Sequence, residues 1–546
     1  MGARRVDMST STRLGRQLEA PAPTWNKSAA VVVVGGGAAG LSAALPLAAA
    51  RIPVVLVCRS TLLDTATARS TSRGIGWRNP PTSEQLASAG DGLTDPAAAG
   101  RLIEQAPELL DWLDALAHQI SSVEQDPRQP LGMTMQRTLA SVARVQELLP
   151  AGTLTIDTHS RAVDVLTDES GHVAGLRVSR GDGTIGDYRA GTVVLATGGA
   201  ARLWTHTTAP AFANGDGLAM ALRAGAALRD LEFVSFAPTA LNAPREERLP
   251  GEAAAEMGPT LRQAGAELVD AAGSTIVPLD ESQHLPDHEL AIRLADWMAA
   301  YPGATAFLDA RGIGDQAWQL APHVVMAQAC REHGINPARQ VIPVRPAAQA
   351  FVGGIAINEV GATTVPGLYA AGEVASSGAN GASGPADGLL IDALVGGTAV
   401  GRHLAQAELP EAADSTDRAL RGADSTDRAL RGFLPTDALA GVRTSADEAL
   451  GLRREHEKLR TTSDFLARLP HEEDFGEDEL TGTNLQAIAA ALAQAAIARP
   501  ESRGWHRRID HAGASDKWAK HVVVSLADDG TLQVTTAALD KPVTTR

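Results

Sequence analysis

Three glycines near the start of the chain have the spacing that phosphate recognition requires. Gly35, Gly37 and Gly40 form a G-x-G-x-x-G pattern directly after the apolar run 30–34. In such a turn the first glycine permits a tight bend, the second lets a pyrophosphate approach the backbone, and the third lets helix and strand pack closely. The N-terminus of the following helix favours the phosphate charge. The pattern predicts a dinucleotide site, although a turn of this kind can also serve packing alone.

The elements around these glycines are those of a βαβ unit. The alanine-rich stretch 40–50 predicts a helix, and the apolar run 54–57 predicts a second buried strand. The acidic residue that would bind a ribose hydroxyl after this strand is absent, and Cys58 and Arg59 stand there. In a nicotinamide enzyme, Arg59 would indicate a contact to a 2′-phosphate.

The remaining chain divides by pattern and composition. Helical patterns reach about residue 149, and short strands are expected at 154–156, 162–166, 173–178 and 192–195. Segment 232–344 differs in composition and contains a helical pattern over 286–300. From 433 the pattern is helical until a closing hairpin at 522–526 and 531–535. Residues 413–422 are repeated without change as 423–432, which indicates a tolerant surface linker.

The bulk composition narrows the classes of function. The chain has 546 residues, a formal net charge of −16 and two cysteines, Cys58 and Cys330. The acidic excess argues against nucleic acid as a partner. Two cysteines cannot build a disulfide framework or a cysteine zinc site, so we expect no metal and a reducing, cytoplasmic location. No apolar run reaches the roughly 18 residues of a membrane span.

Five further motifs follow the glycine turn in a characteristic order. They are Ala-Thr-Gly-Gly at 196–199, Asn-Gly-Asp-Gly at 214–217, Leu-Glu-Phe at 231–233, Gly-Leu-Tyr-Ala-Ala-Gly-Glu-Val at 367–374 and Asp-Gly-Leu-Leu at 387–390. Together they resemble the succinate dehydrogenase/fumarate reductase flavoprotein family, where a lysine or similar residue takes the position of Arg59. Segments 308–312, 330–343 and 501–506 resemble the L-aspartate oxidases of that family. The resemblance covers nearly the whole chain from about residue 29.

The resemblance implies FAD as the cofactor and assigns residues to it. The implied FAD contacts lie at the pyrophosphate, adenosine and flavin ends of the molecule. They comprise Gly35, Gly36, Gly37, Ala38, Ala39 and Gly40 at the pyrophosphate turn; Arg59 near the adenosine ribose; Ala162 and Val163 near adenine; and Asp216, Glu373, Leu389 and Leu390 around the remainder. For Glu373 the alternative is an acid that merely favours a helix N-terminus.

The resemblance also implies the fold. We expect an α/β fold: a Rossmann-like FAD-binding domain with an inserted α+β capping domain and a C-terminal helical domain. The predicted boundaries are a disordered tail at 1–28, the FAD-binding domain at 29–231 and 345–406, the capping domain at 232–344, a linker at 407–432 and the helical domain at 433–546. For the polar, arginine-containing start, a transit peptide is the alternative to a disordered tail.

The positions that bind substrate carboxylates in the family differ in this chain. A family histidine before Pro-Thr is Ala237, a family Thr-Glu is 258–259, and a family arginine in Asn-Arg is Gly384. The family catalytic arginine falls on His288, and a second histidine falls on Gln349. One charge-assisted contact is worth about 1.5–3 kcal/mol, so several such losses would erase dicarboxylate recognition unless other cations replace them.

Replacement groups are present in the sequence. The candidate substrate residues are Arg262, His288, Arg345, Gln349 and Thr239, with Arg73 in a loop expected near the flavin. Arginine forks suit carboxylates, whereas Gln349 and Thr239 can equally hydrogen-bond a neutral substrate. Arg345 can instead be a surface or interface cation, and His288 can be a polar residue at a helix start.

Three hypotheses follow from the sequence. The first is an FAD-dependent L-aspartate oxidase, which passes a hydride from Cα to FAD, releases iminosuccinate, uses oxygen or fumarate as acceptor and serves NAD biosynthesis. The second is a flavin oxidoreductase of the same fold that acts on a different, less anionic small molecule. The third is a flavin-binding paralogue without catalysis. The sequence leaves the oligomeric state open.

Overall fold

A five-stranded parallel sheet carries the glycine turn. The computed structural model describes residues 12–16, 18–69, 83–119, 131–144, 149–243, 252–319, 323–384, 386–411 and 432–539. The sheet has the order β16-β8-β2-β3-β4. Its strands are β2 (Val31–Val34), β3 (Val54–Val57), β4 (Leu154–Asp157), β8 (Val193–Leu195) and β16 (Leu368–Ala370). All four side chains of β2 and of β3 are buried, as expected for a parallel sheet covered on both faces.

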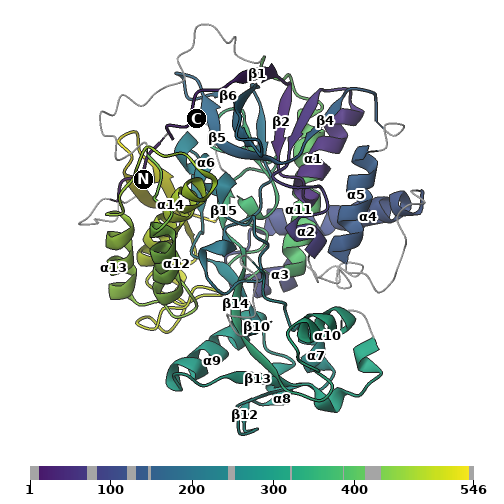
Figure 1. The fold of residues 1–546 in the computed structure, drawn as a ribbon, viewed down its shortest axis with the longest axis vertical. Helices are drawn as coiled ribbons and strands as arrows, with labels where there is room; N and C mark the ends of the chain where they lie inside the picture. Colours follow the sequence, from purple (N-terminus) through teal and green to yellow (C-terminus); the bar gives the residue numbers. More distant parts are fainter. Residues whose placement is uncertain are drawn as a thin grey trace.

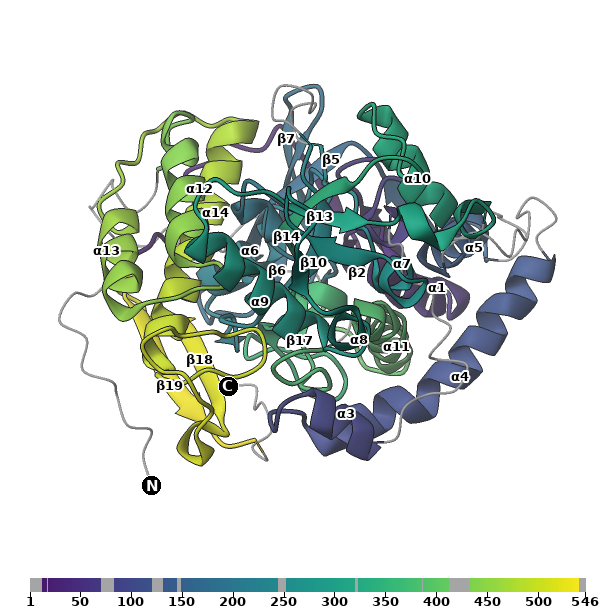
Figure 2. The same ribbon diagram turned by 90° about the horizontal axis from the view of Figure 1, so that it is seen from below.

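Helices cover this sheet and connect its strands. They are α1 (Ala38–Ala49), α2 (Ala66–Arg69), α3 (Ser83–Ala89), α4 (Pro96–Gln119), α5 (Leu131–Arg144), α6 (Asp216–Ala224) and α11 (Ala386–Leu404). Helices α1 and α11 lie side by side behind β2 (Figure 1). Helix α4 runs along the outer edge of the molecule (Figure 2). The predicted βαβ unit at 30–57 is therefore present.

Two further sheets complete the upper body in Figure 1. One has the order β1-β7-β6-β5 and the other β17-β15-β9-β18-β19. The strands of the first are β1 (Trp25–Ser28), β5 (Ser160–Thr167), β6 (Val173–Arg180) and β7 (Ile185–Arg189). Those of the second are β9 (Leu228–Arg229), β15 (Gly354–Ala356), β17 (Ala375–Ser376), β18 (His521–Leu526) and β19 (Leu532–Ala537). The C-terminal hairpin thus extends a sheet begun by the FAD-binding part.

The insert forms a separate lobe below this body in Figure 1. Its sheet has the order β10-β14-β13-β11-β12. The elements are β10 (Val234–Leu241), β11 (Glu267–Val269), β12 (Thr275–Val277), β13 (Ala306–Asp309), β14 (Ile342–Phe351), α7 (Pro259–Gln263), α8 (Leu279–Ser282), α9 (Asp287–Ala300) and α10 (His323–Glu332). The predicted boundary at 344/345 falls inside β14, because this strand runs from the lobe into the body.

The C-terminal region packs α12 (Ala438–Ala449), α13 (His456–Leu466) and α14 (Glu477–Ala498) against the body. Short 3₁₀ helices occur at η2 (Ala201–Leu203), η4 (Arg311–Ile313), η5 (Ala317–Gln319), η6 (Gly372–Val374) and η8 (Asp516–Trp518). The predicted fold class is confirmed: an α/β body with a Rossmann-like sheet, an inserted α+β lobe and a C-terminal helical region. Among the described helices, none combines the length and apolar character needed to cross a membrane.

The start of the chain differs from the predicted disordered tail. Over residues 12–16 and 18–28 the chain packs on the body, with Leu14 and Leu18 buried, and β1 pairs in parallel with β7. Trp25 makes an edge contact with Tyr188, and the Arg180 guanidinium lies over the Trp25 ring. The sequence prediction of disorder was wrong for this segment, because its few apolar residues are placed to dock. Residues 1–11 lie outside the described chain, as does most of the repeated linker segment.

Candidate functional site

The glycine turn leaves room for a ligand at one of its three positions. Gly35 has a φ of +114°, and a Cβ there would lie 2.1 Å from the Ala196 carbonyl oxygen. A Cβ on Gly40 would lie 1.8 Å from the Gly35 carbonyl oxygen. At Gly37, by contrast, the atom of the described chain that a Cβ would meet within 4 Å is the Thr67 hydroxyl oxygen, at 3.4 Å. The fold therefore requires glycine at 35 and 40, whereas Gly37 borders open space at a helix N-terminus.

Two residues that the sequence did not indicate hold this turn. Helix α1 begins at Ala38, followed by Ala39, and the Ala38 N–H donates to the Thr67 hydroxyl over 3.1 Å. The buried Gln136 amide donates to the Gly36 carbonyl oxygen over 2.7 Å. Thr67 thus places a hydroxyl where a pyrophosphate would meet the first N–H groups of α1. Each lies far from the turn in sequence and carries no motif.

Arg59, which was predicted for the adenosine end, lies next to Asp216, which was predicted for the remainder of FAD. Arg161 on β5 donates from Nε and NH2 to the two Asp216 oxygens, over 3.1 and 2.8 Å, and Arg59 lies 3.5 Å from the same carboxylate. Ala162 and Val163 follow Arg161 on β5 and are buried. Burial by itself would raise the pKa of Asp216, but Arg161, together with Arg59 and Asn484, holds that pKa below its usual range. Arg161 is a further member of this cluster that the sequence did not indicate.

Glu373 lies at the end of β16, where the flavin end of the cofactor is expected. It accepts a hydrogen bond from the Phe351 N–H over 3.0 Å, and a Cβ on Gly199 would lie 2.0 Å from its Oε1. Burial raises the pKa of Glu373 to about 7, against the lowering effect of the Phe351 and Gly199 N–H groups. Leu389 and Leu390 are in the first turns of α11, Leu390 buried and Leu389 partly so.

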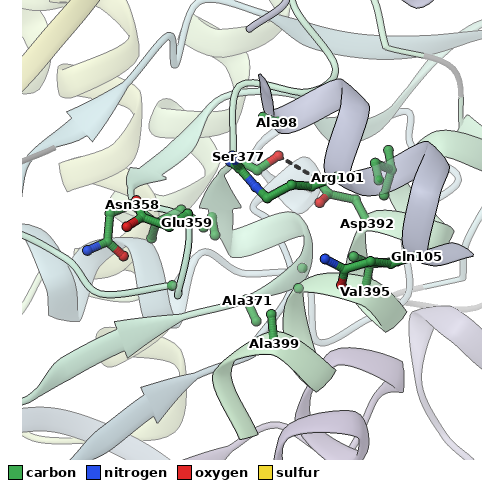
Figure 3. Close-up of a pocket in the computed structure, with 16 residues that line it drawn as sticks. Ala98, Arg101, Gln105, Asn358, Glu359, Ala371, Ser377, Asp392, Val395 and Ala399 are labelled. Atoms are coloured by element: carbon green, nitrogen blue, oxygen red, sulfur yellow. Dashed lines mark hydrogen bonds between the residues drawn. The ribbon is translucent and has the colours of Figure 1, made fainter. Parts of the chain in front are cut away.

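A small cavity lies between α4, α11 and η6 (Figure 3). Its volume is about 60 Å³, and Asp392 and Arg101 line it. Asp392 accepts hydrogen bonds from Ser377 over 2.9 Å and from Asn380 over 3.0 Å, and burial raises the pKa of Asp392 to about 6. These two bonds fix the loop that ends at Gly384. The residues that line this cavity do not include the predicted substrate residues.

On the lobe side, Arg262 is bound by protein groups on three sides. Its Nε donates to the Ser282 carbonyl oxygen over 3.1 Å, its NH1 to the Thr239 hydroxyl over 3.1 Å, and its NH2 to an Asp287 oxygen over 3.3 Å. The Arg262 side chain is 2% exposed. The structure thus brings together two predicted substrate residues, Arg262 and Thr239, and adds an acid next to His288.

His288 stands at the start of α9, where the lobe meets the body. Its ring makes an edge contact with Trp505, with centroids 5.8 Å apart, and the Trp505 ring also lies 6.5 Å from Phe236. The Trp505 indole N–H donates to the Ser383 carbonyl oxygen over 3.2 Å. Burial lowers the pKa of His288, so its imidazole is neutral at pH 7. Trp505 was part of the family resemblance, but the sequence did not indicate this position.

The last two predicted substrate residues, Gln349 and Arg345, lie in different surroundings. Gln349 on β14 donates to the Glu256 carboxylate over 3.0 Å, and the charge of Glu256 acts on Arg262. Arg345 is exposed and interacts electrostatically with Asp447 of α12. Gln349 therefore belongs to the Arg262 group, whereas Arg345 corresponds to the alternative of a surface cation. Arg73 lies outside the described residues.

Comparison with known proteins places this geometry in a family. A model of the FAD binding domain matches residues 30–385, and one of the fumarate reductase flavoprotein C-terminal region matches 477–546. The L-aspartate oxidase of Streptomyces coelicolor is 34% identical over 569 residues, covering 96% of both chains. That of Mycobacterium bovis is 33% identical, covering 93% of this chain and 97% of its own. The chain belongs to the succinate dehydrogenase/fumarate reductase flavoprotein family.

Solved structures agree on the fold. A quinol fumarate reductase of E. coli superposes with a TM-score of 0.78 at 23% identity, over 95% of this chain and 99% of that one. The Sdh1 complex of Mycobacterium smegmatis gives a TM-score of 0.76 at 21% identity, over 95% and 96%. The flavoprotein is an FAD-dependent oxidoreductase resembling L-aspartate oxidase. Its residues fit FAD, because the space beside Gly37 lies at the N-terminus of α1, where backbone N–H groups and the Thr67 hydroxyl would meet a pyrophosphate.

Proposed function

We propose that this flavoprotein oxidises an α-amino acid at Cα, with L-aspartate as the substrate. The observation that carries the proposal is the 33–34% identity to two L-aspartate oxidases over 93–96% of the chain, together with the intact glycine turn. When bound, FAD supplies the acceptor for the hydride that leaves Cα. The chain itself supplies the walls, between the lobe and the body, that orient the substrate and exclude water.

In this proposal, His288 at the start of α9 accepts the proton that the substrate ammonium loses. Oxidation at Cα requires a neutral amine, so a base must hold the proton that the substrate ammonium loses. His288 suits this role because burial keeps its pKa low and its imidazole neutral. Asp287, the neighbour of His288 in sequence, pairs with Arg262, whose NH1 also donates to Thr239. We also propose that the protein is located in the cytoplasm. Its two free, buried cysteines, Cys58 and Cys330, support a reducing compartment.

A second candidate is a less anionic substrate, and one observation favours it. Both described arginines among the predicted substrate residues have acidic neighbours: Arg262 pairs with Asp287, and Arg345 interacts with Asp447. A guanidinium that already faces a carboxylate has less charge to offer a second one. An amino acid with a neutral side chain would need one cationic contact fewer than L-aspartate.

Anaerobic reduction of the flavin tests both candidates. Purified holo-protein is mixed with L-aspartate, D-aspartate and a panel of neutral amino acids, and bleaching of the visible flavin band is followed. Bleaching by L-aspartate with D-aspartate inert supports the first candidate. Bleaching by a neutral amino acid while L-aspartate is inert supports the second. A flavin that no amino acid reduces contradicts both, and favours a flavin-binding role without catalysis.

A matched pair of variants tests the proposed base. His288→Asn removes the group at the lobe–body boundary, whereas His284→Asn changes an exposed histidine just before α9. We expect His288→Asn to slow flavin reduction by about 10²-fold or more and to remove an acidic limb from its pH profile. We expect His284→Asn to leave both unchanged. Equal rates in the two variants would exclude His288 as the base.

A further inference from the structure

One face of helix α14 backs the adenosine end of the FAD site. Glu477, Leu480 and Asn484 are spaced i, i+3 and i+7, so they lie on the same side of the helix. This helix belongs to the C-terminal region. That region begins more than two hundred residues after β7, the last strand in sequence of the sheet β1-β7-β6-β5. In Figure 1 it lies directly against α6.

Each of the three residues contacts a different residue predicted to bind FAD. Glu477 accepts from Arg59 over 3.1 Å, and Asn484 donates to Asp216 over 2.9 Å. Leu480 packs in one buried apolar cluster with Val163. Arg59 follows β3, Val163 lies on β5 and Asp216 begins α6, and a single helix face meets residues from all three places.

The second contact of Glu477 ties these pieces into one network. Arg161 donates from NH1 to the Glu477 carboxylate over 2.9 Å and to its carbonyl oxygen over 2.6 Å, while its other nitrogens hold Asp216. Asn484 is fully buried and also accepts from Arg223 over 2.9 Å. Because the buried Asn484 amide donates to Asp216 and accepts from Arg223, it fixes the geometry of both charged side chains.

We propose that this face of α14 is the outer wall of the adenosine end, and that FAD retention depends on its docking through Glu477 and Asn484. Neither side chain is a catalytic residue: both are positioning residues that act through Arg59, Arg161 and Asp216. Without α14, these side chains would lose the partners that hold them toward the adenosine. Because binding free energies are reciprocal, bound FAD must also strengthen the docking of α14 by the same factor.

The chain offers a matched control in the same helical turn. Glu477→Gln removes the charge that faces Arg59 and Arg161. Glu479→Gln makes the same chemical change two residues on, where the carboxylate instead accepts a hydrogen bond from Thr436. Both substitutions remove one acid from the first turn of α14, so the effect of the helix dipole is the same in both.

The primary measurement is the rate of FAD release from the holo-protein. After dilution, free flavin is followed by its fluorescence. We expect Glu477→Gln to release FAD about three- to fivefold faster than the wild type, as for a partly exposed ion pair. Glu477→Lys, which places a cation against two arginines, should release it more than tenfold faster. Glu479→Gln should remain within about twofold of the wild type. Equal release from Glu477→Gln and Glu479→Gln would overturn the proposal.

Two further readouts separate positioning from general stability. Bound FAD should raise the melting temperature of Glu477→Gln by less than it raises that of Glu479→Gln. Hydrogen exchange in residues 477–484 of the wild type should slow when FAD binds, while exchange in α13 should not change. An equal rise of melting temperature with FAD in the two variants, or exchange in α14 that FAD does not alter, would contradict the coupling. Neither readout involves a substrate, so this test is independent of the amino-acid assay.

Discussion

Gly37 and Gly35 belong to one motif, yet a side chain at each position would meet different atoms. A Cβ on Gly35 would collide with the backbone of Ala196, whereas one on Gly37 would face the Thr67 hydroxyl at 3.4 Å. We therefore expect Gly37→Val to fold and to lose FAD, because the isopropyl group fills the space for the pyrophosphate. Gly35→Val should fail to fold, since it also forces a strained φ of +114°.

Visible absorbance and far-UV circular dichroism of the purified variants distinguish these outcomes. The Gly37→Val protein should show native ellipticity without a flavin band. Stoichiometric flavin in that variant would refute the assignment of the glycine turn to the cofactor.

Glu373 makes stability depend on pH in the flavin-free protein. Burial raises its pKa from 4.5 to about 7, so the folded state binds this proton more tightly than the unfolded state. The contribution of Glu373 is most favourable below pH 4.5 and is lost as the pH rises through about 7. We expect the free energy of unfolding of the wild type to fall across this range by at most about 3 kcal/mol more than that of Glu373→Gln.

Urea unfolding of both flavin-free proteins at several pH values measures this difference. Asp392, whose pKa is also raised, is present in both and cancels in the comparison. Parallel pH curves for the two proteins would show that Glu373 ionises normally.

At the scale of elements, Trp505 joins three segments that are distant in sequence. Its ring touches His288 at the start of α9 and Phe236 on β10, and its N–H binds the loop that carries Ser383. We expect Trp505→Phe to lose the hydrogen bond and to destabilise the protein by about 1 kcal/mol. Trp505→Ala should lose about 3–5 kcal/mol, because it also opens a cavity between lobe and body.

Thermal unfolding of the two Trp505 variants measures the loss of stability in each and shows which loss is larger. A matched control is Trp112→Ala. Trp112 on α4 is 40% exposed, so its replacement should cost the protein little stability. If Trp505→Ala were as stable as Trp112→Ala, the Trp505 contact would not join the lobe to the body.

The elements themselves were largely predictable. The buried strands β2 and β3, helix α9 and the C-terminal hairpin follow from apolar runs, alternation and turn residues, which are local signals. Strand β1 was missed, because its sequence Trp-Asn-Lys-Ser has no strand pattern and is extended only through pairing with β7. A polar segment that docks by one tryptophan resembles a disordered tail in sequence.

At the scale of the whole molecule, a buried ion cluster joins the C-terminal region to the body. The Arg499 side chain is 0% exposed and pairs with Glu232 at 2.6 Å, Glu501 at 3.0 Å and Asp230 at 3.5 Å. Asp230 in turn binds His521 at 2.5 Å. We expect Arg499→Met to destabilise the protein by about 3–5 kcal/mol, because it removes the cation that pairs with the buried Glu232 carboxylate.

Arg293→Met supplies the control for that prediction. Arg293 pairs with Glu281 on the surface and is 47% exposed, so its loss should change stability by no more than about 1 kcal/mol. Urea unfolding should separate the two variants clearly. Similar stability of both would mean that the buried cluster contributes no more than a surface pair.

The sequence by itself determined the βαβ turn, because this turn depends on glycine spacing and on local apolar runs. The family and FAD followed from the resemblance of its motifs to known flavoproteins, which also predicts Arg59, Asp216 and Glu373 as residues near FAD. Only the tertiary structure decided what Arg262 faces, since its partners Thr239, Ser282 and Asp287 come from other elements. It likewise decided that α14 contacts Arg59, Arg161 and Asp216. Charges that pair across distant segments leave no local pattern, whereas a backbone that must bend at one residue does.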